Sequence, residues 1–372
     1  MPDIAKFVQN HKLDIFIIAL LPLVMLLNFI SSKLPNITET IYSENLFIVI
    51  ARTLAILFNI FPFSIFEIIC ITLFCIILSY TLITLLKILK QPSKLIELLS
   101  MFIVRSITFV SIIYFLFIFL WGFNYNRLPL SDILGLTIDK ASVYELENLC
   151  ENLLEKTLEL REQVNEDSTG VMIFEKNLSD IISNAHEGYA VLAKDYKVFS
   201  GKFSKPKKVY FSNIMSIITI PGIYSPFTGE ANINTYPPDI FLPSTICHEM
   251  AHQRGFARED EANFISYLVC KNHTDPQFQY SGYLEVLRYA MHQLYRYDKN
   301  KYNDLKKKYS QGMKNDLHAV YQFWRNYSGT IVAKTSEKMN DTYLKINRQK
   351  DGTHSYGRVV DLLIAEYRKN AN

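Results

Sequence analysis

The sequence predicts a mainly α-helical protein of the α+β class, in which three N-terminal transmembrane helices precede a helical domain with a small β-sheet or hairpin. Three observations lead to this prediction. Apolar residues make up 49% of the 372 residues and form long runs before residue 122. Amphipathic helical patterns fill most of the chain after residue 142, and one β-rich stretch with turn residues lies between residues 208 and 237.

Three apolar runs, at residues 15–31, 66–87 and 101–121, are each about as long as a helix must be to cross the hydrocarbon core of a bilayer. No small-residue cleavage pattern follows the first run, so we expect it to remain as an anchor. The runs predict three transmembrane helices in contact with the lipid bilayer.

A fourth apolar stretch, at residues 45–61, is interrupted by Arg52 and Asn59. If it crossed the membrane, the lysine-rich loop at residues 87–94 would face outward, against the tendency of cationic loops to stay in the cytoplasm. We therefore expect an interfacial helix packed on the three spans.

This topology divides the chain into a membrane domain at residues 1–123 and an extracytoplasmic domain at residues 124–372 of a multi-pass protein of the cell membrane. The formal charge of +3 is nearly balanced, and no basic stripe with interleaved aromatic residues occurs, so we expect no nucleic-acid partner. The five cysteines form no CxxC pair and no disulfide framework.

The β-rich stretch ends shortly before the most informative motif of the chain. Within it, residues 209–211 and 217–220 are rich in β-forming side chains, and Glu230, Ala231 and Asn232 belong to an alternating pattern. These three residues are the candidate edge strand for an extended substrate backbone, and a hairpin that only caps the core is the alternative. Helical patterns are predicted on either side of this stretch, at 142–165, 179–194, 283–297, 302–309, 315–327 and 331–345.

The most informative motif is HExxH, formed by His248, Glu249 and His252. Residues four apart lie on one face of an α-helix, so both imidazoles can bind one metal ion while Glu249 reaches a water bound to that metal. Flanking apolar residues predict a buried helix with its N-cap at position 244 or 245, and Gly255 is placed to end it.

A catalytic zinc ion requires three protein ligands and one open position, so a third ligand must come from another segment. A second helix predicted at residues 258–271 carries carboxylates at its start. Glu259, followed by Ala262 and Asn263, resembles the ExxA(D/N) pattern of gluzincins, zincin peptidases whose third ligand is a glutamate from a second helix. That resemblance implies a role for Asn263 in orienting a ligand. Glu261 is the alternative third ligand, since either carboxylate could face the histidines.

A polar segment near the C-terminus contains His354, Tyr356 and Arg358. A loop this rich in hydrogen-bond donors could lie over the metal and stabilise an oxyanion. The alternative is a solvated connector between two helices.

Several segments, together with the three N-terminal spans, look like a bacterial membrane family labelled domain of unknown function 3810. They are WGFNY, SPFTGEAN, HEMAHQRGFAREDEANF, DTYLK and SYGR, at residues 121–125, 225–232, 248–264, 341–345 and 355–358. The resemblance covers nearly the whole chain, and it implies a zincin-like membrane protein of unassigned substrate.

The residues themselves favour a membrane-anchored zinc metallopeptidase or amide hydrolase that acts outside the cytoplasm on a peptide or protein. In this hypothesis His248, His252 and Glu259 hold Zn²⁺, and Glu249 takes a proton from the metal-activated water as it attacks the carbonyl.

The competing hypothesis is a non-catalytic membrane scaffold or sensor with a structural or vestigial metal site. A structural zinc site would be closed by a fourth protein ligand, for which the sequence offers Glu261 and Asp260.

Overall fold

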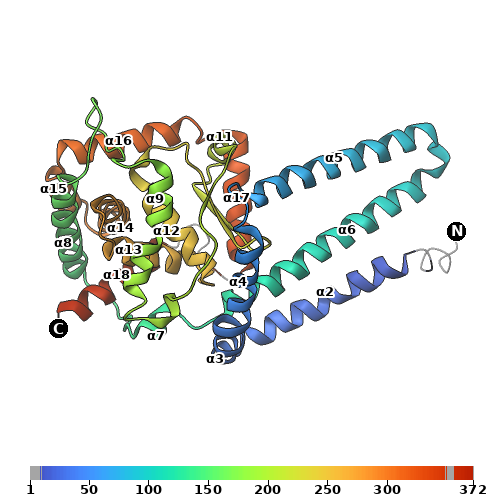
Figure 1. The fold of residues 1–372 in the computed structure, drawn as a ribbon, viewed down its shortest axis with the longest axis horizontal. Helices are drawn as coiled ribbons and strands as arrows, with labels where there is room; N and C mark the ends of the chain where they lie inside the picture. Colours follow the sequence, from blue (N-terminus) through green and yellow to red (C-terminus); the bar gives the residue numbers. More distant parts are fainter. Residues whose placement is uncertain (1–8, 10, 348, 350–355, 372) are drawn as a thin grey trace.

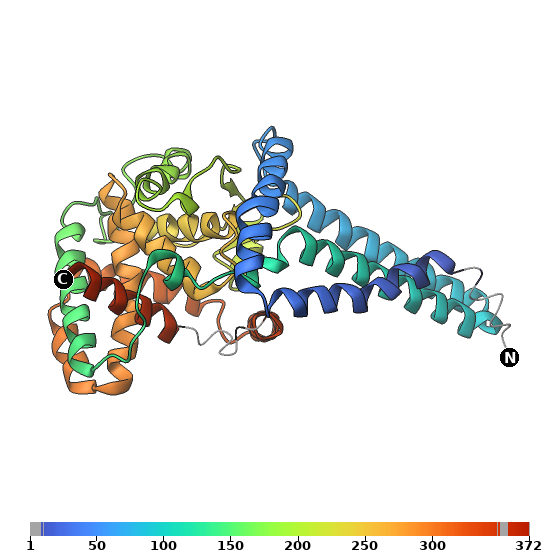
Figure 2. The ribbon, with the colours of Figure 1, turned by 90° about the horizontal axis from the view of Figure 1, so that it is seen from below.

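Three long helices project from a helical domain in the computed structural model, which describes residues 9, 11–347, 349 and 356–371 (Figures 1 and 2). They are α2 (Lys12–Ser31), α5 (Ile65–Lys90) and α6 (Leu95–Leu120), and the short η2 (Pro92–Lys94) joins α5 to α6 at the end far from the domain. Their apolar windows have mean hydropathies of 2.3 to 2.5. At 1.5 Å per residue, each helix is about 30 Å long or longer, which matches the hydrocarbon core. These helices give the protein a membrane-associated part.

A fourth segment, made of α3 (Pro35–Ile37), the π-helix η1 (Thr38–Leu46) and α4 (Phe47–Phe58), is also long and apolar enough to cross a membrane. Figures 1 and 2 show that it lies across the ends of α2, α5 and α6, where these helices meet the domain. One face of α4 is buried through Phe47, and the opposite side exposes large apolar residues such as Ile56.

The rest of the chain is mainly helical. Its core is built around α12 (Leu242–Gln253), α13 (Glu259–Lys271) and α14 (Pro276–Tyr297), which pack against one another, and α14 also packs against α8. The surrounding elements are η3 (Gly122–Asn126), α7 (Leu130–Leu134), α8 (Val143–Arg161), α9 (Leu178–Asn184), α10 (His186–Leu192), η4 (Lys197–Phe199), α11 (Ser212–Ile217), η5 (Asp239–Phe241), α15 (Lys299–Lys307), α16 (Gln311–Arg325), α17 (Ile331–Ile346) and α18 (Tyr356–Ala371).

A small three-stranded sheet contacts α12. Its order is β1 (Lys207–Lys208), β3 (Glu230–Ile233), β2 (Gly222–Ser225), with β1 parallel and β2 antiparallel to β3. The predicted small sheet is confirmed, but its strands differ from those expected: residues 209–211 lie just after β1, and residues 217–220 lie at the end of α11 and in the turn before β2. The chain between β1 and β2 instead forms α11 and a turn.

The strand predicted at Glu230, Ala231 and Asn232 is confirmed, but its predicted edge position is wrong, because β3 lies between β1 and β2. Glu230, Ala231 and Asn232 are completely buried and cannot pair with a substrate backbone. The carboxylate of Glu230 instead accepts hydrogen bonds from the backbone N–H groups of Ile65 and Phe66, at 3.2 and 2.9 Å. It thus satisfies two donors in the first turn of α5, a position that also favours negative charge.

Further polar contacts tie the apolar helices to the domain. Ser64 donates to the side chain of Asn232 at 2.6 Å, and the carboxylate of Glu67 accepts from the backbone N–H groups of Tyr210 and Phe211. Lys207, which is buried, donates to carbonyl groups just after the end of α4. Strand β3 and its neighbours therefore attach the start of α5 and the end of α4 to the domain.

Candidate metal centre

Helix α12 carries the HExxH residues. It begins at Leu242 rather than at an N-cap in position 244 or 245, because Ser244 lies inside the helix and its hydroxyl donates to the carbonyl of Phe241 at 2.9 Å. The predicted end at Gly255 is confirmed. This glycine has a φ of 81°, and a Cβ there would lie 2.9 Å from the ring of Phe47, so both the backbone and the space favour glycine.

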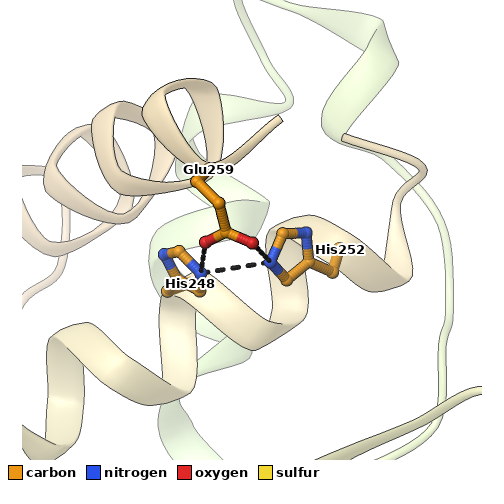
Figure 3. A group of neighbouring side chains, drawn as sticks. All are labelled: His248, His252 and Glu259. Carbon is orange, nitrogen blue, oxygen red and sulfur yellow. Dashed lines mark hydrogen bonds and ion pairs between the residues drawn. The ribbon is translucent and has the colours of Figure 1, made fainter. Parts of the chain in front are cut away.

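The turn after Gly255 brings Glu259, the first residue of α13, back over the two histidines (Figure 3). The Nε2 atoms of His248 and His252 are 3.1 Å apart. The Glu259 carboxylate places Oε2 3.2 Å from Nε2 of His248 and Oε1 3.6 Å from Nε2 of His252. The three potential metal-binding side chains thus converge, as the sequence predicted. One ligand atom from each of them lies within 4.8 Å of the other two.

Burial and mutual charges shift the pKa values of His248, His252 and Glu259 strongly. Burial lowers the pKa of His248, but the hydrogen bond and charge of Glu259 outweigh it and raise the pKa to about 9. Burial lowers the pKa of His252 to about 4. For Glu259, burial raises the pKa, and the two histidines more than reverse this and lower it to about 2. The carboxylate is therefore charged and strongly favours a positive charge between the three side chains.

The backbone fixes the orientation of His252. Its Nδ1 lies 2.7 Å from the carbonyl oxygen of Phe256, which can only accept, so Nδ1 carries the proton and Nε2 presents a lone pair to the cluster. The indole of Trp121 donates to the carbonyl of His252 at 3.3 Å and packs edge-on to the imidazole, with ring centroids 5.8 Å apart. This is the outer-shell support that metal-binding histidines generally have. Asn263 makes no side-chain hydrogen bond to another described residue, so its predicted orienting role gains no support.

Glu249 is buried against strand β2. A Cβ on Gly222 would lie 2.6 Å from its Oε1 and 2.7 Å from its Cγ, so only glycine fits there. Burial raises the pKa of Glu249 to about 8, although the charge of His248 and a hydrogen bond from the backbone of Tyr224 lower it. Its Oε2 is buried and has no hydrogen-bond partner among the described residues.

Glu261, the alternative third ligand, lies elsewhere. Its Oε1 accepts from the backbone N–H of Leu130 at 2.8 Å and pairs with the guanidinium of Arg258 at 2.7 Å. On a helix, Glu259 and Glu261 are about 200° apart, so the two carboxylates face different sides of α13. The structure therefore groups Glu259 with the histidines and leaves Glu261 out.

Of the three predicted oxyanion donors, Arg358 is the one whose side chain is described. Arg358 pairs with Asp260 at 2.8 Å, while His354 and the side chain of Tyr356 lie outside the described residues. Two tyrosines that the sequence did not single out in this role are near Glu259 instead. The hydroxyl of Tyr125 donates to that of Tyr343 at 2.9 Å, and burial together with the negative charge of Glu259 raises the pKa of both.

Strand β2, not β3, is the edge strand that lies beside Glu249, and the backbone of its residue Tyr224 donates to that carboxylate. The sequence reasoning missed this strand because Pro221 and Gly222 were interpreted only as turn residues. The signal that could have found it is the need for a glycine where a backbone approaches another element closely.

Comparison with known proteins gives a family and no function. A family described as "Protein of unknown function (DUF3810)" matches residues 42–364. No curated protein and no solved structure matches the chain.

Proposed function

The chain belongs to this family of proteins of unknown function, and from the geometry of the site we propose that it is a membrane-anchored zinc metallohydrolase that cleaves peptide or amide bonds. The observation that carries the proposal is the convergence of His248, His252 and Glu259 beside the buried carboxylate of Glu249. In this proposal three helices, α2, α5 and α6, cross the membrane, and the domain is zincin-like and extracytoplasmic.

The donor set fits zinc. Ligand atoms about 2.0–2.1 Å from a tetrahedral zinc ion are about 3.3 Å from one another. The separations between the closest atoms of the three side chains are 3.1, 3.2 and 3.6 Å. Two imidazoles and a carboxylate are a common ligand set of catalytic zinc sites, which leave one position open.

Zinc, when bound here, would supply a Lewis acid that activates water and polarises a carbonyl group. The residues of the chain provide the rest. Glu249 accepts a proton from the attacking water, whose oxygen bonds to the carbonyl carbon, and delivers that proton to the leaving nitrogen as the C–N bond breaks. Its raised pKa suits both halves of this transfer. Strand β2, an edge strand beside Glu249, offers backbone groups to an extended substrate.

A closed structural site is the less supported reading. Such a site needs a fourth protein ligand, and the sequence offered Glu261 and Asp260. Both carboxylates are engaged with arginines, Arg258 and Arg358 respectively. Among the described residues, the converging group contains three side chains.

The test uses the full-length protein purified in detergent or vesicles. We expect one zinc per chain by elemental analysis, loss of that zinc in His248→Ala and His252→Ala, and cleavage of a peptide library that a chelator abolishes. Stoichiometric zinc retained in both alanine variants would refute the site. Zinc bound normally without cleavage of any peptide or amide would refute the catalytic proposal and favour a structural metal.

A further inference from the structure

Helix α17 has an exposed apolar face that no other described element covers. Ile331, Val332, Met339 and Ile346 are between 49% and 85% exposed. At 100° per residue these four side chains fall within an arc of about 100°, which makes them a single stripe along the helix. Lys334, Lys338 and Lys345 lie beside this arc, where long cationic side chains reach lipid headgroups.

The face of α17 opposite this stripe is buried through Ala333 and Leu344, and two side chains at the edge of the stripe attach the helix to the base of the membrane helices. The hydroxyl of Ser336 donates to the carbonyl of Ile218, just after α11, and the ring of Tyr343 packs edge-on against Phe117 of α6, with centroids 6.0 Å apart. Figures 1 and 2 place α17 on the side of the domain from which α2, α5 and α6 leave, with its axis across theirs.

Exposed aromatic residues also lie at the base of α5. Tyr210 is 83% exposed, and its backbone N–H is bonded to Glu67 in the first turn of that helix. Phe61 and Phe63, immediately before α5, are exposed as well. Because Tyr210 is fixed to the first turn of α5, these exposed aromatic residues lie at the level where α5 would enter the bilayer.

We propose that α17 lies in the bilayer surface as an amphipathic helix and thereby holds the metal cluster at the membrane, where it acts on polypeptides anchored in the same bilayer. The cluster is close enough for this arrangement. Tyr343 of α17 bonds to Tyr125 at 2.9 Å, Tyr125 packs edge-on against Trp121 with ring centroids 5.3 Å apart, and Trp121 packs in the same way against His252 at 5.8 Å. The Glu259 side chain is 31% exposed and that of His248 is 15% exposed, so a chain leaving the bilayer beside α17 can reach the ligands.

The first part of the proposal is tested with a fluorophore. In a background with the exposed cysteines replaced, Cys70→Ala and Cys75→Ala, Met339→Cys is labelled with an environment-sensitive dye in full-length protein. The protein is reconstituted into vesicles of phosphatidylcholine and phosphatidylglycerol with brominated acyl chains. We expect blue-shifted emission that bromine quenches, since an interfacial helix buries its apolar face about 5–10 Å deep.

Two matched positions serve as controls. Glu337→Cys is an exposed site on the side of the same helix away from the stripe, and Tyr297→Cys is an exposed site at the end of α14, directly before α15, which Figure 1 places on the far side of the domain from the membrane helices. Both labels should show water-like emission with little quenching. The same water-like emission at position 339 would overturn the proposed placement of α17.

The second part rests on the proposed function. One peptide library is offered free in solution and, at equal total concentration, fused to a single transmembrane helix in the same vesicles. We expect the tethered library to be cleaved at least about tenfold faster, because anchoring raises its effective concentration at the site. Equal rates would overturn the anchored substrate while leaving the hydrolase intact. No cleavage of either library by zinc-loaded protein would refute the proposed function itself, and the fluorophore result on α17 would still stand.

Discussion

Replacing Gly222 by alanine tests the catalytic geometry with the smallest possible change. The added Cβ would lie 2.6 Å from Oε1, 2.7 Å from Cγ and 3.0 Å from Cδ of Glu249. Carbon atoms in ordinary contact are about 3.5–4.0 Å apart, so the carboxylate must move by about 1 Å. Glu249 is buried, and its displacement is therefore resisted on all sides.

The expected effect is on turnover rather than on metal binding. A displacement of about 1 Å in a reacting group can cost about a hundredfold in rate, which corresponds to about 2.7 kcal/mol. His248 and His252 project from a different side of α12, so the zinc content should stay at one per chain. Overpacking of the site should also cost about 1–3 kcal/mol of stability.

The assay measures kcat/KM on the best peptide from the library, together with zinc content and thermal unfolding. Gly357→Ala is the matched control, since its added Cβ would meet only the side-chain nitrogen of Gln293, at 3.6 Å, and alanine favours a helix. We expect Gly222→Ala to lose activity and the control to keep it. If Gly222→Ala kept activity within about threefold of the unchanged protein, the assignment of Glu249 as the proton acceptor beside β2 would be refuted.

Three further predictions concern the proposed roles and the topology. Glu249→Gln should keep zinc and abolish turnover, because the amide preserves shape but cannot accept a proton, and residual activity within about threefold would exclude a general base at this position. Glu259→Ala should weaken zinc binding by orders of magnitude, whereas Glu261→Ala should cost about tenfold or less in zinc affinity and about 1–3 kcal/mol of stability through its lost partners; a zinc titration with the reverse ranking would contradict the site. In cells expressing the background without Cys70 and Cys75, a membrane-impermeant thiol reagent should modify Tyr297→Cys and not Lys90→Cys, and the opposite pattern would place the domain in the cytoplasm.

The clustering of His248, His252 and Glu259 could be predicted because its signal is local. The spacing of His248 and His252 fixes them to one face of a helix whatever the rest of the chain does. Gly255 then ends that helix, and the short connection leaves Glu259 little choice of position. The membrane helices were predictable for a similar reason, since length and hydropathy alone define them.

The presence of a small sheet could be predicted, but its strand order could not, because that order depends on distant contacts. Strand β3 becomes central only because β1, more than twenty residues earlier, pairs with it. The stretch 217–220 is rich in β-branched residues, yet Thr219 adopts a φ of 59°, a conformation that such residues rarely take. The side chain and the backbone N–H of Asn234 donate to the carbonyl groups of Ile220 and Pro221 and hold this turn. These contacts cannot be predicted from the local sequence pattern.

The same dependence on distant contacts explains why Tyr343 was missed. It lies 218 residues from Tyr125, its hydrogen-bond partner near Glu259. The amphipathic pattern of α17 shows that a helix exists, but only packing decides which of its residues turn toward the metal cluster.

Helix α12, which carries the two histidines, depends on contacts from the N-terminal part of the chain. Arg127 donates to Glu39 of η1 and, with its Nη1, to the carbonyl of Gly255 at 3.1 Å, just after the end of α12. Removing one partner of a buried ion pair typically costs about 3–5 kcal/mol, because the other charge stays buried without compensation. Trp121, at the end of α6, bonds to the backbone of His252. Residues 124–372 on their own would therefore lose contacts that orient the histidines, and an assay of that fragment would test a different site from the one in the whole chain.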